Sequence, residues 1–206
     1  KWFEPAQHQP SEKLSDVVTS AIDQVIKTQQ PVCINAGEEE EIEIFLDFFA
    51  PPPRLIVIGA VHTAISLVSM AKMVGFYTIV IDARAAFATR QRFPHADELI
   101  KAYPPDVLRQ LSLDETSYVV TLTHDEKYDN PSLAIALGHN VRYIGALGSR
   151  RTHQKRLASL RESGISDSLL SRIHAPVGLD LGGRTPEEIA VEIIAQITAV
   201  RRGIAI

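Results

Sequence analysis

The sequence predicts an α/β protein built on a doubly wound parallel sheet, with a small α+β appendage before it. Two observations predict this fold. After residue 53, short apolar runs alternate regularly with helical patterns, which is typical of a parallel sheet covered by helices on both faces. The apolar run Leu55–Ile58 also stops at a glycine turn, and the next run, Tyr77–Ile81, ends on Asp82. Strand, turn, helix, strand and terminal acid form the first unit of a dinucleotide-binding sheet.

Length and charge exclude several classes of protein. The 206 residues, 45% of them hydrophobic, suit one sizeable domain with an appendage. A net charge of −4 offers no basic field to a polyanion, so nucleic acid is not expected as a partner. No apolar stretch approaches the ~20 residues that span a bilayer, and no secretory signal opens the chain. We therefore expect a cytoplasmic protein with no membrane anchor.

Two further observations concern the cysteine and the start of the chain. The single cysteine, Cys33, suits a reducing compartment and is expected to be buried as a small apolar residue. The chain begins at Lys1 rather than at a methionine, which leaves room for residues upstream.

Three consecutive prolines, Pro51–Pro53, mark the clearest boundary, because they cannot continue a helix and form a stiff extended connector. The boundary predicts an appendage over residues 1–50 and a main domain over residues 51–206. In the appendage, periodicity predicts a helix over residues 11–28 and strands over residues 31–35 and 41–48.

In the main domain, apolar runs predict five strands, over residues 54–58, 77–81, 99–101, 118–122 and 141–144. Helices are expected over residues 62–74, after Pro104, over residues 131–137, from Ser149 to before Gly164, and from a capping box that begins at Thr185. Right-handed crossovers then give a sheet of order 3-2-1-4-5.

Ligands of such sheets bind outside the carboxyl ends of the strands, where the winding reverses. Polar residues and glycines gather at these ends, and the sequence predicts a cofactor site there without assigning a catalytic residue. The candidates follow the first, second, fourth and fifth strands in turn: Gly59, Ala60, Val61 and His62; Asp82 and Arg84; Thr123, His124 and Asp125; Gly148, Ser149, Arg150 and Arg151.

Asp82 lies 23 residues after Gly59, close to the ~20-residue spacing of a ribose-binding carboxylate. Arg84 could serve a phosphorylated ribose, although an acid in this position normally disfavours the extra charge. Val61 replaces the second glycine of the fingerprint, which normally lets a pyrophosphate approach the backbone. Binding is then weaker, displaced, or directed at a different phosphate-bearing ligand.

Arg150 and Arg151 occupy the first turn of a predicted helix, where cations oppose the helix dipole. Two arginines after Gly148 and Ser149 are explained if an anion such as a phosphate must be held there. The alternative is that both side chains simply extend into solvent.

Two histidines, His62 and His124, are expected at the same edge of the sheet. With Asp125 and Asp129 they could supply metal ligands or an acid/base pair, or each imidazole could bind a loop backbone or a phosphate. No HExxH-like spacing is present, so we assign no metal site.

Several motifs in the right order resemble the XdhC/CoxI family, and the resemblance runs from Pro51 to about Arg202. They are Pro51–Leu55, Gly59–His62, Asp82–Arg84, Arg92–Pro94, Thr123–Asp125, Tyr143–Arg151, Pro176–Asp180 and Thr185–Ala190.

The resemblance implies an accessory protein of molybdenum hydroxylases such as xanthine dehydrogenase. Such a protein binds molybdenum cofactor, a phosphate-bearing pterin, favours its sulfuration and delivers it to the apoenzyme. The implied partners are a molybdenum hydroxylase apoenzyme and a cysteine desulfurase as sulfur donor, and the sequence leaves a homodimer open. The alternatives in the same crevice are an NAD(P)-dependent oxidoreductase, with His62 or His124 as proton donor, and a non-catalytic dinucleotide sensor.

The chain departs from the family pattern at two places. Val61 stands where the family has glycine. The family's amino-terminal domain, with its functional cysteine, is absent or reduced to its last part, for which residues 1–50 are the candidate remnant. Cys33 lies near the expected position of a Cys-Gly-Gly element, but Ile34 and Asn35 do not preserve that element.

Overall fold

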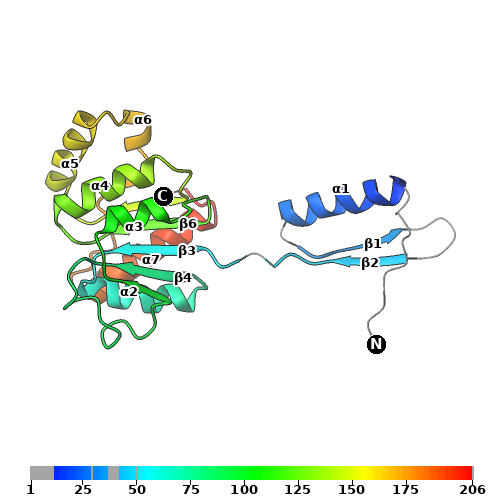
Figure 1. Ribbon diagram of the computed structural model, residues 1–206, viewed down its shortest axis with the longest axis horizontal. Coiled ribbons are helices and arrows are strands. Elements are labelled where there is room, and N and C mark those ends of the chain that lie inside the picture. The colour runs from blue at the N-terminus through cyan, green and yellow to red at the C-terminus, as the bar shows by residue number, and fades with distance from the viewer. Residues whose placement is uncertain (1–11, 29, 37–41, 50, 206) are drawn as a thin grey trace. The chain divides into compact units, whose positions relative to one another are not determined.

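The computed structural model describes residues 12–28, 30–36, 42–49 and 51–205 (Figure 1). The chain forms two compact units that divide between Pro51 and Pro52. Among the described residues, no helix is both long enough and apolar enough to cross a membrane. The predicted starting residues Ser11 and Glu41 lie outside the described residues.

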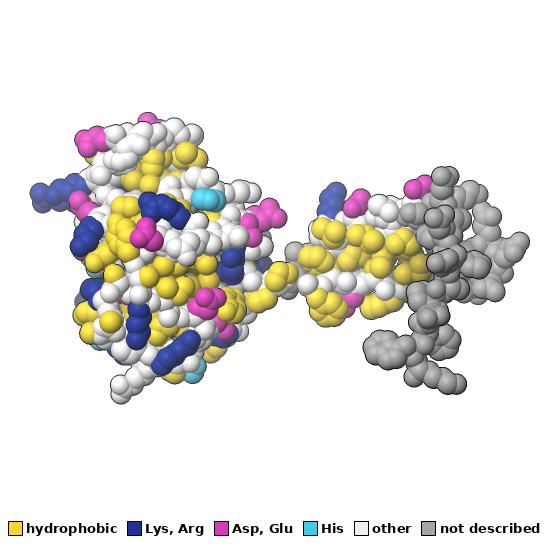
Figure 2. Space-filling view, viewed as in Figure 1, with side chains coloured by type: hydrophobic (Ala, Val, Ile, Leu, Met, Phe, Trp, Pro, Cys, Tyr) yellow, Lys and Arg dark blue, Asp and Glu magenta, His cyan; other side chains and the backbone are white. Residues whose placement is uncertain are grey.

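The smaller unit packs helix α1 (Glu12–Thr28) against a two-stranded antiparallel sheet of β1 (Val32–Ala36) and β2 (Ile42–Leu46). Ala21 and Val25 of α1 are buried. Other apolar side chains stay exposed, and Figure 2 shows hydrophobic side chains on the visible face of this unit. The exposed ones include Val17, Ile22, Ile26 and Phe45.

The prediction that Cys33 is buried was wrong. Successive side chains of a strand point to opposite faces. Cys33 is therefore exposed, on the face of β1 opposite to the partly buried Val32 and Ile34. Its thiol donates to Glu43 Oε1 at 3.0 Å, and this hydrogen bond raises the pKa of the thiol.

The larger unit contains a six-stranded sheet in which all strand pairs are parallel, in the order β5-β4-β3-β6-β7-β8. The strands are β3 (Arg54–Ile58), β4 (Tyr77–Ile81), β5 (Glu98–Ile100), β6 (Ser117–Thr121), β7 (Tyr143–Ala146) and β8 (Ile173–His174). The predicted order 3-2-1-4-5 is confirmed. The two-residue strand β8 extends it and was not predicted, since it is too short to show any alternation.

Helices cover both faces of this sheet, as a doubly wound fold requires (Figure 1). One face carries α2 (His62–Met73) and α7 (Pro186–Arg201), which pack together over an apolar cluster that includes Leu55 and Val57. The other face carries α3 (Pro104–Gln110), α4 (Glu126–Leu137), α5 (Arg150–Glu162) and α6 (Asp167–Leu170), over Ile56 and Ile58. Alternate residues of β3 therefore fill two separate cores.

Helix α4 begins five residues before its predicted start at Pro131. Asp125 caps the helix, because its side chain accepts from the Lys127 N–H at 3.0 Å. Pro131 then lies inside the helix and cannot donate to the carbonyl of Lys127. The Tyr103 hydroxyl donates to that carbonyl instead, at 3.1 Å, so the proline is tolerated.

Candidate functional site

The carboxyl ends of the four central strands lie at one level, because the pairing register aligns their last residues. Ile58 pairs with Ile81 and with Thr121, and Thr121 pairs with Ala146. The four loops that follow therefore leave the sheet along one edge, which we call the rim. It comprises residues 59–62, 82–84, 122–125 and 147–151.

The first loop of the rim is a tight turn at Gly59, whose φ is +107°. A Cβ atom at Gly59 would lie 2.8 Å from Thr123 Cγ2, so only glycine lets this turn approach β6 so closely. The next residue, Ala60, donates its N–H to Asp82 Oδ2 at 2.7 Å. The turn is thus held between the loop after β4 and the loop after β6.

Helix α2 begins directly after this turn with an apolar cap. Val61 is the N-cap residue and provides no side-chain hydrogen bond, and the first turn of the helix contains no acidic residue. Valine is among the poorest N-cap residues, so no side chain from the cap competes for the N–H groups of the first turn. His62, at the start of the helix, is exposed.

Asp82 is buried, and its carboxylate already accepts four hydrogen bonds. Oδ1 accepts from the Arg84 backbone N–H and from Arg84 Nε, both at 2.9 Å. Oδ2 accepts from Ala60 N–H and from Arg84 Nη2, both at 2.7 Å. Burial alone would raise the pKa of Asp82, but the hydrogen bonds from Arg84 and Ala60 outweigh it and lower the pKa. The ribose-binding role of Asp82 stays a prediction. In this structure both carboxylate oxygens already accept hydrogen bonds from Ala60 and Arg84.

The segment after Arg84 folds back onto the glycine turn. Arg92 Nη1 donates to the carbonyls of Ala60 and Phe87, at 2.9 and 2.8 Å. The guanidinium groups of Arg84 and Arg92 lie 4.5 and 5.5 Å from the centre of the Phe87 ring. Sequence reasoning gave Arg92 and Phe87 no role at the site, although Arg92 opens the motif Arg92–Pro94.

The loop after β6 connects the rim to the interior. Thr123 Oγ1 donates to Asp129 Oδ1 at 2.6 Å and accepts from the Asp125 N–H at 3.1 Å. His124 between them is exposed and has φ +61°, an uncommon conformation for a residue other than glycine. Asp125 is occupied as the cap of α4.

Asp129 does not reach the rim, where it was considered as a metal ligand or an acid/base group. Its side chain is 1% exposed and faces Arg156, which is 3% exposed, across 3.7 Å. Arg156 Nη2 also donates to the Leu147 carbonyl at 3.1 Å, just before Gly148. Burial raises the pKa of Asp129 and lowers the pKa of Arg156. This buried pair links the loops after β6 and β7. The only signal of the pair in the sequence is an arginine, Arg156, on the inner face of α5.

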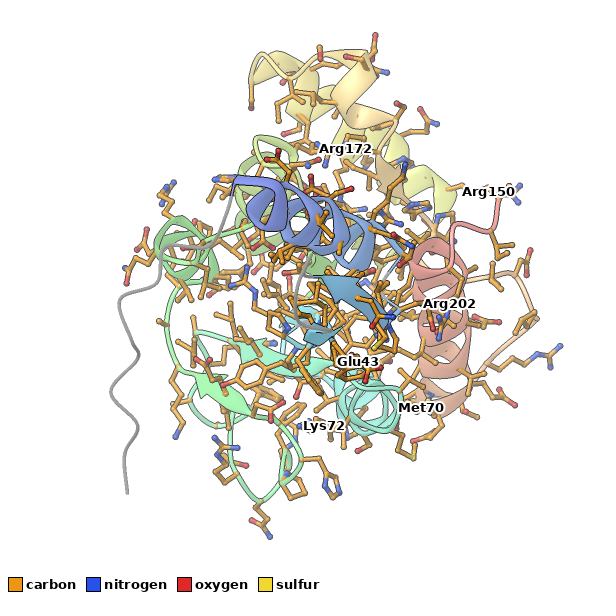
Figure 3. All side chains as sticks on the ribbon, turned by 90° about the vertical axis from the view of Figure 1, so that its right-hand side faces the viewer. Glu43, Met70, Lys72, Arg150, Arg172 and Arg202 are labelled. Carbon is orange, nitrogen blue, oxygen red and sulfur yellow. The ribbon has the colours of Figure 1, made fainter. Side chains whose placement is uncertain are left out.

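The loop after β7 ends at the start of α5. Ser149 caps the helix, accepting from the Thr152 N–H at 3.1 Å, which confirms the predicted cap. Arg150 and Arg151 follow in the first turn, which contains no acid, and both side chains are exposed. Figure 3 labels Arg150 at the surface of the larger unit. Neither arginine makes a hydrogen bond or an ion pair with another described residue. Both guanidinium groups are therefore available to an anion.

The structure brings the predicted residues together to different degrees. Gly59, Ala60, Asp82, Arg84 and Thr123 form one cluster of direct contacts, as described above. Gly148 and Ser149 join it through the buried pair Asp129–Arg156. The remaining candidates lie exposed on the same rim: His62, His124, Arg150 and Arg151. In the described part of the chain, no group of three or more His, Cys, Asp or Glu side chains is arranged to hold a metal ion.

The sequence profile of a family described as the XdhC Rossmann domain matches residues 55–197, well over half of the chain. The chain belongs to the XdhC family. The resemblance seen in the sequence motifs is confirmed, and the six-stranded sheet is the Rossmann domain of an XdhC protein.

Two similar proteins have names that refer to xanthine dehydrogenase and to molybdenum cofactor. The chain is 34% identical over 168 residues to a protein of Bacillus subtilis (strain 168) named as a probable xanthine dehydrogenase subunit, covering 82% of the chain and 49% of that protein. It is 30% identical over 153 residues to "Molybdenum cofactor insertion chaperone PaoD" of Escherichia coli (strain K12), covering 74% and 42%.

A solved structure gives the same picture. A crystal structure described as a xanthine dehydrogenase from Bacillus halodurans matches with a TM-score of 0.67 and 34% identity, covering 79% of the chain and 46% of that protein. The chain therefore spans about half, or less, of the length of the relatives it matches.

The close approach at Gly59 predicts an unusually costly substitution. Gly59→Ala should lower the free energy of unfolding by about 3 kcal/mol, because it combines a disfavoured φ with a clash against Thr123. Gly75→Ala is the matched control, since Gly75 has φ +86° but nothing within 4 Å of its Cβ position, and it should cost about 1–2 kcal/mol. Equal costs in urea denaturation would show that the contact between Gly59 and Thr123 is not tight.

The bonds to Asp82 predict a pH-dependent loss of stability. Since the folded-state pKa of Asp82 is lowered, its interactions contribute stability above the unfolded pKa of about 3.9, and this contribution is lost as pH falls through the folded value. Asp82→Asn should cost about 2–3 kcal/mol at pH 7, and the gap to the wild type should narrow below about pH 4.

Urea denaturation between pH 3 and pH 7 measures this gap. Asp106→Asn is the control, since Asp106 forms an exposed pair with Arg109 and its loss should change stability by less than about 0.5 kcal/mol. A gap between Asp82→Asn and the wild type that is constant over this range would contradict the assignment.

Proposed function

We propose that this chain binds molybdenum cofactor at the rim and serves as an accessory protein in the maturation of a molybdenum hydroxylase. The observation that carries the proposal is the start of α5. There, two exposed arginines without partners among the described residues follow a glycine turn at the carboxyl edge of a Rossmann sheet. The likeness to a protein named as a molybdenum cofactor insertion chaperone supports the choice of ligand.

The residues of the rim fit a ligand that carries a phosphate. Arg150 and Arg151 would supply charged donors, and the N–H groups at the start of α5 would add the positive end of the helix dipole. The start of α2 offers a second set of N–H groups that the Val61 side chain does not cap. The pterin would then lie along the rim, over the loops that start at Gly59 and at Thr123.

An accessory role requires only binding, orientation and release from the chain's own residues. The bound cofactor would supply the redox-active metal to the hydroxylase, which is the proposed recipient. His62, His124, Arg150 and Arg151 are exposed on the rim, so a ligand held there would stay accessible to another protein, which suits transfer. A cysteine desulfurase is the proposed sulfur donor, which would reach the cofactor from the same exposed side.

The glycine turn and the acid after β4 favour one alternative, a dinucleotide as the ligand. An NAD(P)-dependent reductase or a non-catalytic dinucleotide sensor would use the same crevice. Hydride transfer to a carbonyl compound in the presence of NAD(P)H, with no response to molybdenum cofactor, would favour the reductase. A thermal shift with a dinucleotide alone, without turnover, would favour the sensor.

The anion site at α5 predicts the behaviour of a double variant. Molybdenum cofactor at about 100 times its Kd should stabilise the wild type by roughly 2.7 kcal/mol. Arg150→Ala/Arg151→Ala should weaken binding about 10- to 100-fold, because two charge-assisted contacts to the phosphate are lost. Thermal shifts over a ligand titration measure both effects.

A matched control lies on the same helix. Arg161 is in the last turn of α5 and pairs with Asp167, so Arg161→Ala removes a positive charge from α5 far from the rim. Its affinity should equal that of the wild type. Unchanged affinity in the double variant would reject the role of Arg150 and Arg151.

A further inference from the structure

The loop after β4 contains a further cationic group, Arg84. Its ion pair with Asp82 determines which ligands the rim can bind at the end of β4. In a Rossmann sheet, a carboxylate at this position accepts hydrogen bonds from the hydroxyls of the adenosine ribose. A carboxylate has about four lone-pair sites for hydrogen bonds. Asp82 already accepts four, three of them from Arg84, and its side chain is 3% exposed.

A ribose diol could bind Asp82 only by displacing the guanidinium of Arg84. Arg84 Nε and Nη2 bond the two oxygens as a fork, with charge-assisted hydrogen bonds of 2.9 and 2.7 Å. Two neutral hydroxyls would replace these bonds with weaker ones and would leave Arg84 without its partner. The observed arrangement therefore disfavours a ligand with a free diol at this position.

The guanidinium of Arg84 is both fixed and accessible. Its plane is held by Asp82 and by the ring of Phe87, which lies 4.5 Å from its central carbon. The side chain is 38% exposed, and its remaining nitrogen, Nη1, donates to no described residue. A fixed arginine with free N–H donors matches the oxygens of a phosphate.

The charges around Arg84 are of both signs. Asp82 is neutralised by the fork, and Arg92 adds a second positive charge over the same ring, at 5.5 Å. The hydrogen bonds to Asp82 raise the pKa of Arg84, and the charges of Asp82, Tyr128 and Asp125 add to this rise. Asp125 is exposed to solvent and occupied as the cap of α4. Arg84 and Asp82 cancel in charge, so the net positive charge at this end of the rim comes from Arg92, and solvent screens the exposed carboxylate of Asp125.

We infer that Arg84, and not Asp82, is the ligand-binding group at the end of β4, and that the rim prefers a ligand with a phosphate monoester there over one with a free ribose diol. The inference rests on the proposed function only in placing a ligand at the rim. It adds a second anion site, separate from Arg150 and Arg151 at the start of α5.

NAD and NADP are suitable probes, because they differ by one phosphate monoester on the adenosine ribose. Titration calorimetry of the whole chain should show NADP binding at least tenfold more tightly than NAD. Arg84→Ala should remove this preference, weakening NADP at least tenfold and leaving NAD unchanged or tighter, since Asp82 is then free to accept a diol. Arg109→Ala, which removes an exposed arginine of α3, should leave both affinities unchanged.

A second variant guards against a loss of folding. Arg84→Lys keeps the charge without the fork, and it should retain part of the preference for NADP, with circular dichroism confirming the fold. The inference is wrong if the wild type binds NAD as tightly as NADP, if it binds neither, or if Arg84→Ala weakens both equally. A thermal shift with molybdenum cofactor on the same proteins tests the proposed function separately, since either result can fail while the other holds.

Discussion

The buried carboxylate of Asp82 is the interaction on which the rim depends. It joins three parts of the chain that the sheet alone would leave independent: the glycine turn after β3, the end of β4, and the segment that carries Arg84. Because this carboxylate is buried, its oxygens need hydrogen-bond donors from the protein. The donors, Ala60 and Arg84, are held in place by these bonds. The geometry at this end of the rim is therefore set before any ligand arrives.

A second buried acid connects loops at the other end of the rim. Asp129 binds Thr123 and faces Arg156, while Arg156 binds the carbonyl that precedes Gly148. The loop that touches the Gly59 turn is thereby connected to the loop that presents Arg150 and Arg151. The two ends of the rim, one at Arg84 and one at the start of α5, are positioned by two buried acids, Asp82 after β4 and Asp129 on α4.

Much of this fold follows from local signals that the sequence contains. Alternating apolar runs, the Ser149 cap and the Thr185 capping box predict elements that the structure confirms, because each depends on residues only a few positions apart. Strand β8, the early start of α4 and the exposure of Cys33 depend on tertiary contacts, which a single sequence does not reveal. The position of Asp82 could be predicted from spacing, but its four bonds could not. Arg156 was missed because its partner Asp129 lies 27 positions earlier, on another helix.

The comparisons and the geometry bear on function in different ways. The family match identifies the Rossmann domain, while the relatives are about twice as long as the part that this chain covers, or longer. The proposed role in cofactor maturation therefore depends on what the rim itself can bind. A crystal structure of the chain with molybdenum cofactor tests this most directly. We expect the cofactor phosphate to contact Arg150, Arg151 and the first turn of α5. A cofactor bound on another surface, or with its phosphate away from these groups, would contradict the proposed role.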